Sequence, residues 1–327
     1  MRFMKALEGK KVLFITTKNI DYIRNSQEIK ILAQRASSVT QIYSDKKKYI
    51  GRILEIWIRL LRVKWHDYDT IFVGFAPQLV FPFYCKFSRK VVIIDFFISV
   101  YDTLINDRKK FGKKSVVAKC SHWLDKYVIK KADYIITDTR ADAAYFIKEF
   151  QGDRAKFEAL YLEADSAIYY ERKQNKSRNL KDKFVVLYFG SILPLQGVEV
   201  VLKTVVSLRD RNDIYFQIIG PISNEYEKPI QDNVEYIDWL PQECLAEYIA
   251  NADLCLAGHF SKDIDKARRT IPGKAYIYEA MGKRMILGEN EANRELFHED
   301  ERHFFVEMGK AEGIVQIIKW LVERGNR

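Results

Sequence analysis

FVVLYFGSILPLQGVEVVLKTVVSLRDRNDIYFQIIG, residues 184–220, contains three segments with different periodicity. Residues 184–192 form a continuous run of mostly apolar, β-branched and aromatic side chains, which is typical of a buried strand. Valines and leucines recur at helical spacing over 198–210, and a second apolar run occupies 214–220. Two strands that are joined by a helix in this order pair in parallel, and the helix is the crossover connection between them. The stretch therefore predicts a βαβ unit.

The same alternation extends on both sides of this unit. We predict further strands at 10–17, 39–44, 69–75, 90–97, 132–139, 233–240, 252–258 and 284–289, and helices at about 26–36, 47–65, 115–131, 141–150, 242–250 and 311–324. Such alternation is typical of the α/β class with parallel sheets. Residues 169–183 are polar, charged and aperiodic, and read as a linker. We therefore predict two Rossmann-like domains facing across a cleft, residues 1–175 and 176–327, with the last helix able to pack back on the first domain.

Charge is divided unevenly between the two halves of the 327-residue chain. Residues 1–175 carry 33 Lys+Arg and 20 Asp+Glu (33 − 20 = +13), and residues 176–327 carry 21 and 24 (21 − 24 = −3). We expect the basic half to meet an anionic partner such as lipid, nucleic acid or a phosphorylated substrate. The four cysteines lack metal-like spacing and no secretory signal is visible. We expect a cytoplasmic protein, bound peripherally to the inner face of the cell membrane.

The loop FGSILPLQG (189–197) follows the first strand of the second domain. Ligands of doubly wound sheets bind beyond the carboxyl ends of the strands, and this loop lies at such an end. Gly190 and Gly197 allow a sharp turn and a close approach of the backbone to a ligand, and free amides in such turns bind anions. The loop is neither GxGxxG nor a Walker loop, so a plain strand-to-helix turn is the alternative.

A second stretch, RRTIPGKAYIYEAMGKRMILGENEANREL (268–296), places positive charge where a helix begins. A helix that starts at a proline directs free amides and its positive dipole end toward a ligand. A diphosphate is the ligand that suits this arrangement best, because amides and cations bind its oxygens. The candidate residues are Arg268, Arg269, Pro272, Gly273 and Lys274.

Glu279 stands about one and a half helical turns after Lys274. A carboxylate there is able to accept hydrogen bonds from the two hydroxyl groups of a ribose. The alternative is a solvent-exposed acid that balances Lys283 and Arg284.

Residues 184–296 resemble the donor-binding domain of GT-B fold glycosyltransferases of the group 1, or family 4, type. FGSILPLQG looks like the phosphate loop of that family, VEYIDWLPQECLAEYIANADLCLAG like its base-binding segment, and IPGKAYIYEAMGKRMILGENEANREL like its sugar-nucleotide signature. The resemblance implies a nucleotide-diphosphate sugar as donor, no required metal or cofactor, ribose binding by Glu279, and retention of anomeric configuration.

The chain departs from the family pattern at three positions. Ile271 stands where a glutamate is usual, and Ser191 and Gln196 replace the arginine and lysine of the phosphate loop. A subset of the family has a basic segment followed by Ile-Pro-x-Lys instead, and this chain is similar to that subset. The hypothesis is that cations of 268–274 supply the charge missing from the loop, with Gly190 and Ser191 contributing the loop's backbone.

Three further residues are candidates for contact with the base and the sugar. The base is expected near the backbone of Ile237 and the ring of Trp239, although a core position for Trp239 is the alternative. His259 begins a loop after the strand 252–258 and is expected to touch the sugar or a phosphate. Packing or plain surface exposure is the alternative for His259.

The first domain must supply the acceptor side. Asp95 lies near the end of the strand predicted at 90–97, and Asp102 comes seven residues later. The family places a catalytic His or Asp on the loop after this strand, so we expect either acid to contact the acceptor hydroxyl or the sugar; a strand-end cap is the alternative for Asp95. The run 106–114 carries five cations that we expect to meet the phosphates of a lipid-linked acceptor or of the membrane that bears it: Arg108, Lys109, Lys110, Lys113 and Lys114.

The helix predicted at 47–65 is amphipathic and basic. Its apolar face is predicted to hold Ile50, Ile53, Leu54, Trp57, Leu61 and Trp65, with Arg52, Glu55, Arg59, Arg62 and His66 opposite. We expect this face to cover a sheet, and insertion in a bilayer interface is the alternative.

Three alternatives to a glycosyltransferase remain open. A sugar-nucleotide epimerase or a phosphorylase has the same double-Rossmann shape. A non-catalytic sugar-nucleotide binder is a second alternative, because the glutamate usual at position 271 is missing. A nucleic-acid-binding protein would explain the basic half, but its lysines are spread over several elements without a reading motif. We therefore expect a nucleotide sugar, a glycan or lipid-linked acceptor and an anionic membrane surface as partners, and no nucleic acid.

Overall fold

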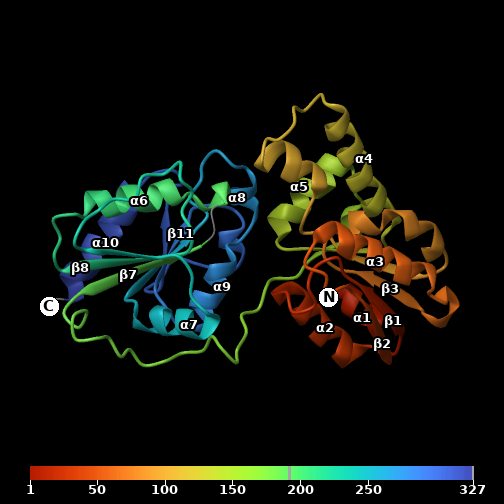
Figure 1. The fold of residues 1–327 in the computed structure, drawn as a ribbon, viewed down its shortest axis with the longest axis horizontal. Coiled ribbons are helices and arrows are strands. Elements are labelled where there is room, and N and C mark those ends of the chain that lie inside the picture. Colours follow the sequence, from red (N-terminus) through yellow and green to blue (C-terminus); the bar gives the residue numbers. More distant parts are fainter. Residues whose placement is uncertain (191–192, 326–327) are drawn as a thin grey trace. The chain divides into compact units, whose positions relative to one another are not determined.

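The computed structural model describes residues 1–190 and 193–325, and divides the chain into two α/β units, Met1–Leu162 and Glu163–Arg327 (Figure 1). The boundary lies 13 residues before the one predicted from the sequence. Residues of the expected linker belong to unit 2 because they bond to it: the Gln174 side chain donates to Ala252 O at 3.0 Å, and the Lys176 ammonium pairs with Asp253.

Unit 1 is built on a parallel sheet of six strands in the order β2-β1-β3-β4-β5-β6. The strands are β1 (Lys11–Ile15), β2 (Ser38–Ile42), β3 (Thr70–Val73), β4 (Val91–Asp95), β5 (Tyr134–Thr137) and β6 (Phe157–Ala159). The helices are α1 (Arg2–Leu7), α2 (Ile23–Arg35), α3 (Tyr49–Leu61), α4 (Val116–Lys131) and α5 (Arg140–Phe150), with shorter turns η1 (Trp65–Asp67), η2 (Pro77–Phe87), η3 (Asp102–Asp107) and η4 (Arg154–Lys156).

The helices of unit 1 form one layer on each face of the sheet. Alternate residues of a strand point to opposite faces, and in β1 Leu13 and Val12 belong to two different cores. The core that contains Leu13 is closed by α3, η2, α4 and α5, and the core that contains Val12 is closed by α1 and α2. A layer that contains α3, η2 and α4 therefore covers one face of the sheet.

Unit 2 repeats the plan, with a second parallel sheet in the order β12-β11-β10-β7-β8-β9. The strands are β7 (Phe184–Phe189), β8 (Ile214–Ile219), β9 (Val234–Ile237), β10 (Leu254–Gly258), β11 (Met285–Gly288) and β12 (His303–Val306). The helices are α6 (Val198–Ser207), α7 (Gln242–Asn251), α8 (Lys266–Arg269), α9 (Gly273–Ala280) and α10 (Glu312–Gly325), with turns η5 (Pro194–Gln196) and η6 (Asn293–Glu295).

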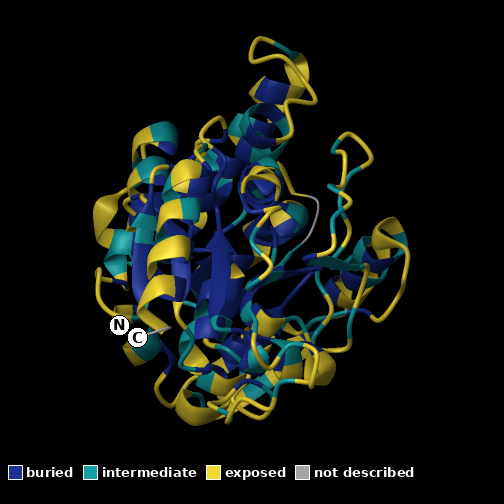
Figure 2. Cartoon of the chain, turned by 90° about the vertical axis from the view of Figure 1, so that its left-hand side faces the viewer, coloured by how far each residue is buried: buried dark blue, intermediate teal, exposed yellow. Residues whose placement is uncertain are grey.

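The strands of unit 2 are mostly buried, except for the half-buried edge strand β9, whereas the outer sides of its helices are exposed (Figure 2). The last helix, α10, places Ile314, Ile318 and Leu321 in the core of unit 2 and packs on α6 and β12. The apolar face of this helix is therefore used within its own unit.

The βαβ prediction for 184–220 is confirmed as β7, α6 and β8, with parallel pairing from Phe184 with Ile214 to Phe189 with Ile219. Elements that were not predicted include α1, η2, β6, α8 and β12. They are short or, in η2, interrupted by Pro82, so their periodicity is too brief to read.

Candidate donor-binding site

The carboxyl edge of the unit 2 sheet brings together loops that are far apart in the sequence. Gly190 follows β7, Gly220 follows β8, Trp239 lies two residues after β9, and His259 follows β10. All strands of this sheet run parallel, so their carboxyl ends meet at one edge. This is the edge at which doubly wound sheets bind ligands.

At this edge Gly220 lies too close to Gly190 for any residue with a side chain to replace it. Gly220 has φ +111°, and a Cβ on it would stand 2.0 Å from the carbonyl oxygen of Gly190. A Cβ on Gly190 would stand 2.9 Å from the Lys274 ammonium nitrogen. The edge therefore presents bare backbone next to a cation, an arrangement that suits the oxygens of a phosphate.

Lys274 is the central charged group of this edge. It lies in the first turn of α9, is only 5% exposed, and donates to the side-chain oxygen of Gln196 at 2.6 Å. Its nitrogen stands 4.0 Å from the centre of the Tyr188 ring. Burial lowers the pKa of Lys274 well below its ordinary value. Within the described part of the chain no carboxylate pairs with this nitrogen, so a buried amine faces the glycines without a counter-ion.

Sequence reasoning missed the roles of Tyr188 and Gln196 in holding this lysine. Tyr188 was counted only as a strand residue, and Gln196 only as a departure from the family pattern. The missed signal was the position of Gln196 just before Gly197, whose φ of +66° turns the loop back against Phe260. The Gln196 side chain thereby reaches Lys274, although the two residues are 78 positions apart.

His259 is a neutral hydrogen-bonding group at the same edge. It is 4% exposed, and its Nδ1 lies 3.1 Å from the carbonyl oxygen of Thr270. A carbonyl only accepts, so Nδ1 carries the hydrogen and Nε2 is the accepting nitrogen of the ring. Burial lowers the pKa of His259 to about 3. The imidazole is therefore neutral at physiological pH and suited to accept a hydrogen bond from a hydroxyl group.

The basic segment before α9 lies beside the phosphate loop, as α8 packs on η5. Arg268 is exposed, whereas Arg269 is buried with its Nε donating to Asp265 at 2.9 Å. Pro272 caps α9, which begins at Gly273. Ser191, the loop residue predicted to contact phosphate, lies outside the described residues.

Trp239 is a surface residue rather than a core residue. Its side chain is 74% exposed at the carboxyl end of the edge strand β9. The neighbouring Ile237 carbonyl already accepts from the amide of Gly220 at 2.7 Å, which ties this loop to the glycine pair. An exposed indole at this position is free to stack on a flat ring.

The ribose-binding role predicted for Glu279 is corrected by the structure. Lys274 and Glu279 are five residues apart, about 7.5 Å along a helix at 1.5 Å per residue. Helix α9 runs antiparallel to the strands, so Glu279 reaches the amino edge of the sheet. There its carboxylate accepts from Arg302 at 3.2 Å and lies 2.7 Å from Nε2 of His303, the first residue of β12.

We expect Glu279→Gln to leave binding of a nucleoside diphosphate unchanged within twofold. The same change is expected to lower the free energy of unfolding by about 1 kcal/mol, because a partly exposed ion pair and a hydrogen bond to the buried His303 are weakened. Calorimetric titration and urea unfolding of the same preparation measure the two quantities. A loss of affinity of tenfold or more would restore the ribose role.

The carboxyl edge of the unit 2 sheet lies in a part of the chain that matches a known protein family. Residues 183–324 match the family model described as glycosyl transferases group 1. Unit 2 is a group 1 glycosyltransferase domain. The match begins one residue before β7 and ends within α10, so it takes in the glycine pair, Lys274 and His259 of the group 1 domain.

Solved structures extend the likeness to both units. Anabaena HepE in complex with UDP-glucose is 14% identical, with 97% of this chain and 91% of that chain covered and a TM-score of 0.65. Sucrose-phosphate synthase from Thermosynechococcus elongatus is 11% identical, with 96% and 90% covered and a TM-score of 0.67. At such identities the likeness shows the fold, and the fold is GT-B: two Rossmann-like units in one chain, the second of them the group 1 domain.

A sequence relative is an uncharacterized 41.2 kDa protein in the cps region of Klebsiella pneumoniae. It is 22% identical over 228 residues, which are 66% of this chain. The chain spans about three fifths (61%) of the length of that relative.

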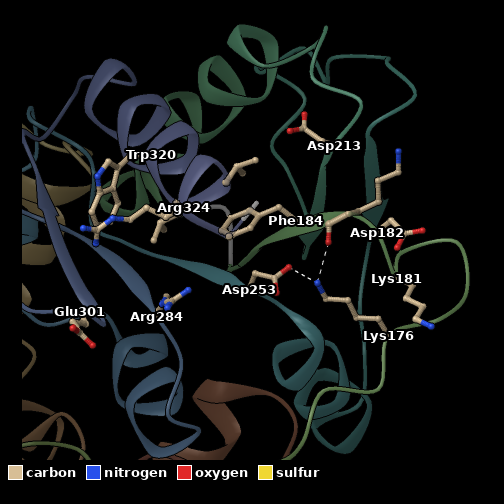
Figure 3. Close-up of a pocket in the computed structure, with 14 residues that line it drawn as sticks. Lys176, Lys181, Asp182, Phe184, Asp213, Asp253, Arg284, Glu301, Trp320 and Arg324 are labelled. Atoms are coloured by element: carbon tan, nitrogen blue, oxygen red, sulfur yellow. Dashed lines mark hydrogen bonds and ion pairs between the residues drawn. The ribbon is translucent and has the colours of Figure 1, made fainter. Parts of the chain in front are cut away.

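A cavity of about 540 Å³ lies at the opposite edge of the group 1 domain (Figure 3). Phe184, Asp253 and Arg284, which line it, stand at or just before the amino ends of their strands. Lys176 pairs there with Asp253 and donates to Lys183 O at 2.9 Å. At this cavity the segment that precedes β7 is bonded to the amino edge of the sheet. The cavity is therefore at the opposite edge from the glycine pair.

Unit 1 does not expose either of the carboxylates predicted to contact the acceptor. Asp95 has no exposed surface, and its two oxygens accept from Arg24 at 2.8 and 3.0 Å. Asp102 is 2% exposed and accepts from Asn106 and Tyr145 at 3.0 and 3.1 Å. The expectation that one of them receives an acceptor hydroxyl is therefore corrected, because both are engaged inside the unit.

Proposed function

We propose that the protein transfers a sugar from a nucleoside-diphosphate donor to a hydroxyl group of a glycan or lipid-linked acceptor, with retention of configuration and without a required metal. The observation that supports it most strongly is the buried, unneutralised Lys274 beside the glycine pair of a group 1 domain. Burial without a counter-ion disfavours the charged form of Lys274, and a bound diphosphate supplies the missing opposite charge.

The chemistry needs stabilisation of the leaving group. The bond between the anomeric carbon and the phosphate oxygen breaks, and negative charge develops on the diphosphate. Lys274 and the cations at 268–269 stabilise that charge without reorganising during the reaction. The acceptor oxygen forms the new bond to the anomeric carbon, and its proton passes to the departing phosphate oxygen. His259 accepts a hydrogen bond from a sugar hydroxyl and orients the ring.

Trp239 is proposed to stack on the base of the donor. We expect Trp239→Ala to weaken binding of UDP by about 10-fold or more, since stacking of a base on an aromatic ring contributes about 1–3 kcal/mol. Binding of inorganic pyrophosphate, which has no base, is expected to stay unchanged. Competition titration with the two ligands separates the contributions, and an equal loss for both would contradict stacking.

The deciding experiment is a calorimetric screen of nucleotide sugars in the presence of a chelator. UDP-glucose is the first compound to test, because HepE was solved with it; UDP-galactose, UDP-N-acetylglucosamine and GDP-mannose follow. Binding of one nucleoside diphosphate family, followed by transfer to a hydroxyl acceptor with NMR assignment of the anomeric configuration, is the expected result. No binding of any donor without metal, or a product of inverted configuration, would overturn the corresponding part of the proposal.

A further inference from the structure

Helix α3 of unit 1 carries an apolar stripe on its outer side. Ile50, Leu54, Ile58 and Leu61 are spaced by four, four and three residues, so they lie on one face, and they are 77%, 53%, 52% and 76% exposed. The inner side of the helix packs on the sheet through Ile56 and Leu60. The expectation that this helix covers a sheet is thus confirmed: Trp57 and Trp65 of the predicted face pack against the core, whereas Ile50, Leu54 and Leu61 point outward.

The stripe is bordered by cations that the fold holds in place. Lys46, Lys47 and Lys48 precede α3 and are exposed, and Arg59 and Arg62 lie along it. Arg52, predicted to face solvent, is buried instead, and its guanidinium donates twice to the carbonyl oxygen of Lys46, at 2.9 and 3.2 Å. This contact fixes the lysine run against the start of the helix.

A second apolar and basic group lies in the same layer, around the start of α4. Val116, Trp123 and Phe111 are 75%, 57% and 43% exposed. All five cations predicted to meet phosphates in this region (Arg108, Lys109, Lys110, Lys113 and Lys114) are exposed. Helices α3 and α4 both pack against η2, whose Phe81 ring contacts the Trp123 ring, so the two groups share one layer of unit 1 (Figure 1).

The charge of this layer is strongly positive at the surface. Residues 46–131 contain 19 Lys+Arg and 7 Asp+Glu (19 − 7 = +12). Sixteen of the cations are exposed, whereas four of the acids are buried: Asp95, Asp102, Asp107 and Asp125. A surface that buries four of its seven acids and presents aliphatic side chains among cations is complementary to anionic headgroups above an apolar layer.

We propose that the outer face of the α3–η2–α4 layer docks on an anionic lipid bilayer, with the α3 stripe inserted among the headgroups and the flanking cations on lipid phosphates. A second copy of this chain is disfavoured as the occupant, because the contact would oppose two faces of like charge. A nucleic acid would use the cations but not the four aliphatic side chains. Among the described residues no helix has the length and apolarity to cross a bilayer, and the docking needs none.

The test is flotation of the full chain with vesicles of phosphatidylcholine alone or with 30% phosphatidylglycerol. We expect binding to the anionic vesicles that weakens as salt is raised. Leu54→Gln/Leu61→Gln and Lys113→Glu/Lys114→Glu are each expected to lower the partition coefficient by about 10-fold or more. Ile230→Gln removes an apolar residue that is 97% exposed in unit 2, and is expected to change nothing.

Scanning calorimetry of the unit 1 transition shows that the variants are folded, and binding of UDP by the same variants keeps this inference separate from the proposed transfer activity. Equal binding to both kinds of vesicle, no binding, or no effect of Leu54→Gln/Leu61→Gln would overturn the docking surface. A dimer in solution that the same pair of substitutions dissolves would assign the stripe to a second copy. Tight salt-sensitive binding of DNA without vesicle binding would assign the cations to nucleic acid.

Discussion

Replacing Lys274 with methionine is expected to weaken binding of UDP by about 100-fold, since a hydrogen bond to a charged group contributes about 1.5–3 kcal/mol. The same substitution is expected to leave the protein equally or more stable, because methionine fills similar space without a buried charge. Loss of ligand binding together with retained stability is the pattern of a residue kept for function at a cost to the fold.

Lys283→Met is the matched control. Lys283 is also partly buried with a lowered pKa, but it donates to Ala250 O near the amino edge of the sheet. Its substitution is expected to leave UDP binding unchanged. Calorimetric titration of the two variants measures the difference, and an equal effect of both would remove Lys274 from the donor site.

The lowered pKa of Lys274 also predicts proton uptake on binding. A diphosphate favours the charged ammonium, so the pKa of Lys274 rises in the complex. Between the pKa of the free state and that of the complex, binding takes up as much as one proton, and affinity falls by up to about tenfold per pH unit as pH rises. Titrations in buffers with different ionisation enthalpies measure this uptake, and Lys274→Met is expected to abolish it.

Replacing Arg24 with methionine is expected to lower the free energy of unfolding of unit 1 by about 3–5 kcal/mol. Arg24 is 1% exposed and forms the buried ion pair with Asp95, so its removal leaves that carboxylate without a counter-charge. Its guanidinium also bonds to the carbonyl oxygen of Leu160, close to the end of unit 1. Scanning calorimetry is expected to show a fall of roughly 6–20 °C in the transition of unit 1.

Glu28→Gln is the control within the same cluster. Burial, with the charge of Asp95 as a further cause, raises the pKa of Glu28 well above its ordinary value. The contribution of Glu28 to the free energy of unfolding is fully present below pH 4.5, the ordinary pKa of a glutamate, and is lost as pH rises through the raised pKa. Glutamine resembles the protonated acid, so this variant is expected to be at least as stable at pH 8 and to lose that pH dependence. If Arg24→Met lowered the free energy of unfolding of unit 1 no more than Glu28→Gln does, the ion pair between Arg24 and Asp95 would not contribute to stability.

Periodicity predicted most of the fold because it depends on short-range patterns. The apolar runs of β7 and β8 and the helical spacing of α6 are legible within a few residues, and the order of such segments implies parallel sheets. The same reasoning located the candidate site, since loops that follow parallel strands gather at one edge. Gly190, His259 and Lys274 were predicted there, and the structure brings them to the carboxyl edge of one sheet.

The same reasoning did not predict which way the side chains of a helix point. Glu279 was assigned to the donor because it is close to Lys274 in sequence, but a helix that crosses the sheet carries residues a turn and a half apart to different edges. On α3 the pattern showed an amphipathic helix without showing which neighbours cover it, so Arg52 was placed outside and Leu54 and Leu61 inside.

The amino-acid order alone thus specified two parallel α/β units, a basic first half and a glycine-rich, cationic edge in the second half, because each depends on local pattern or on the direction of parallel strands. Only the packed chain decided that Lys274 is buried without a carboxylate, that Asp95 and Asp102 are engaged inside unit 1, and that α3 presents aliphatic side chains outward. These facts depend on contacts between residues tens of positions apart, and burial and pairing are properties of those contacts rather than of any one segment.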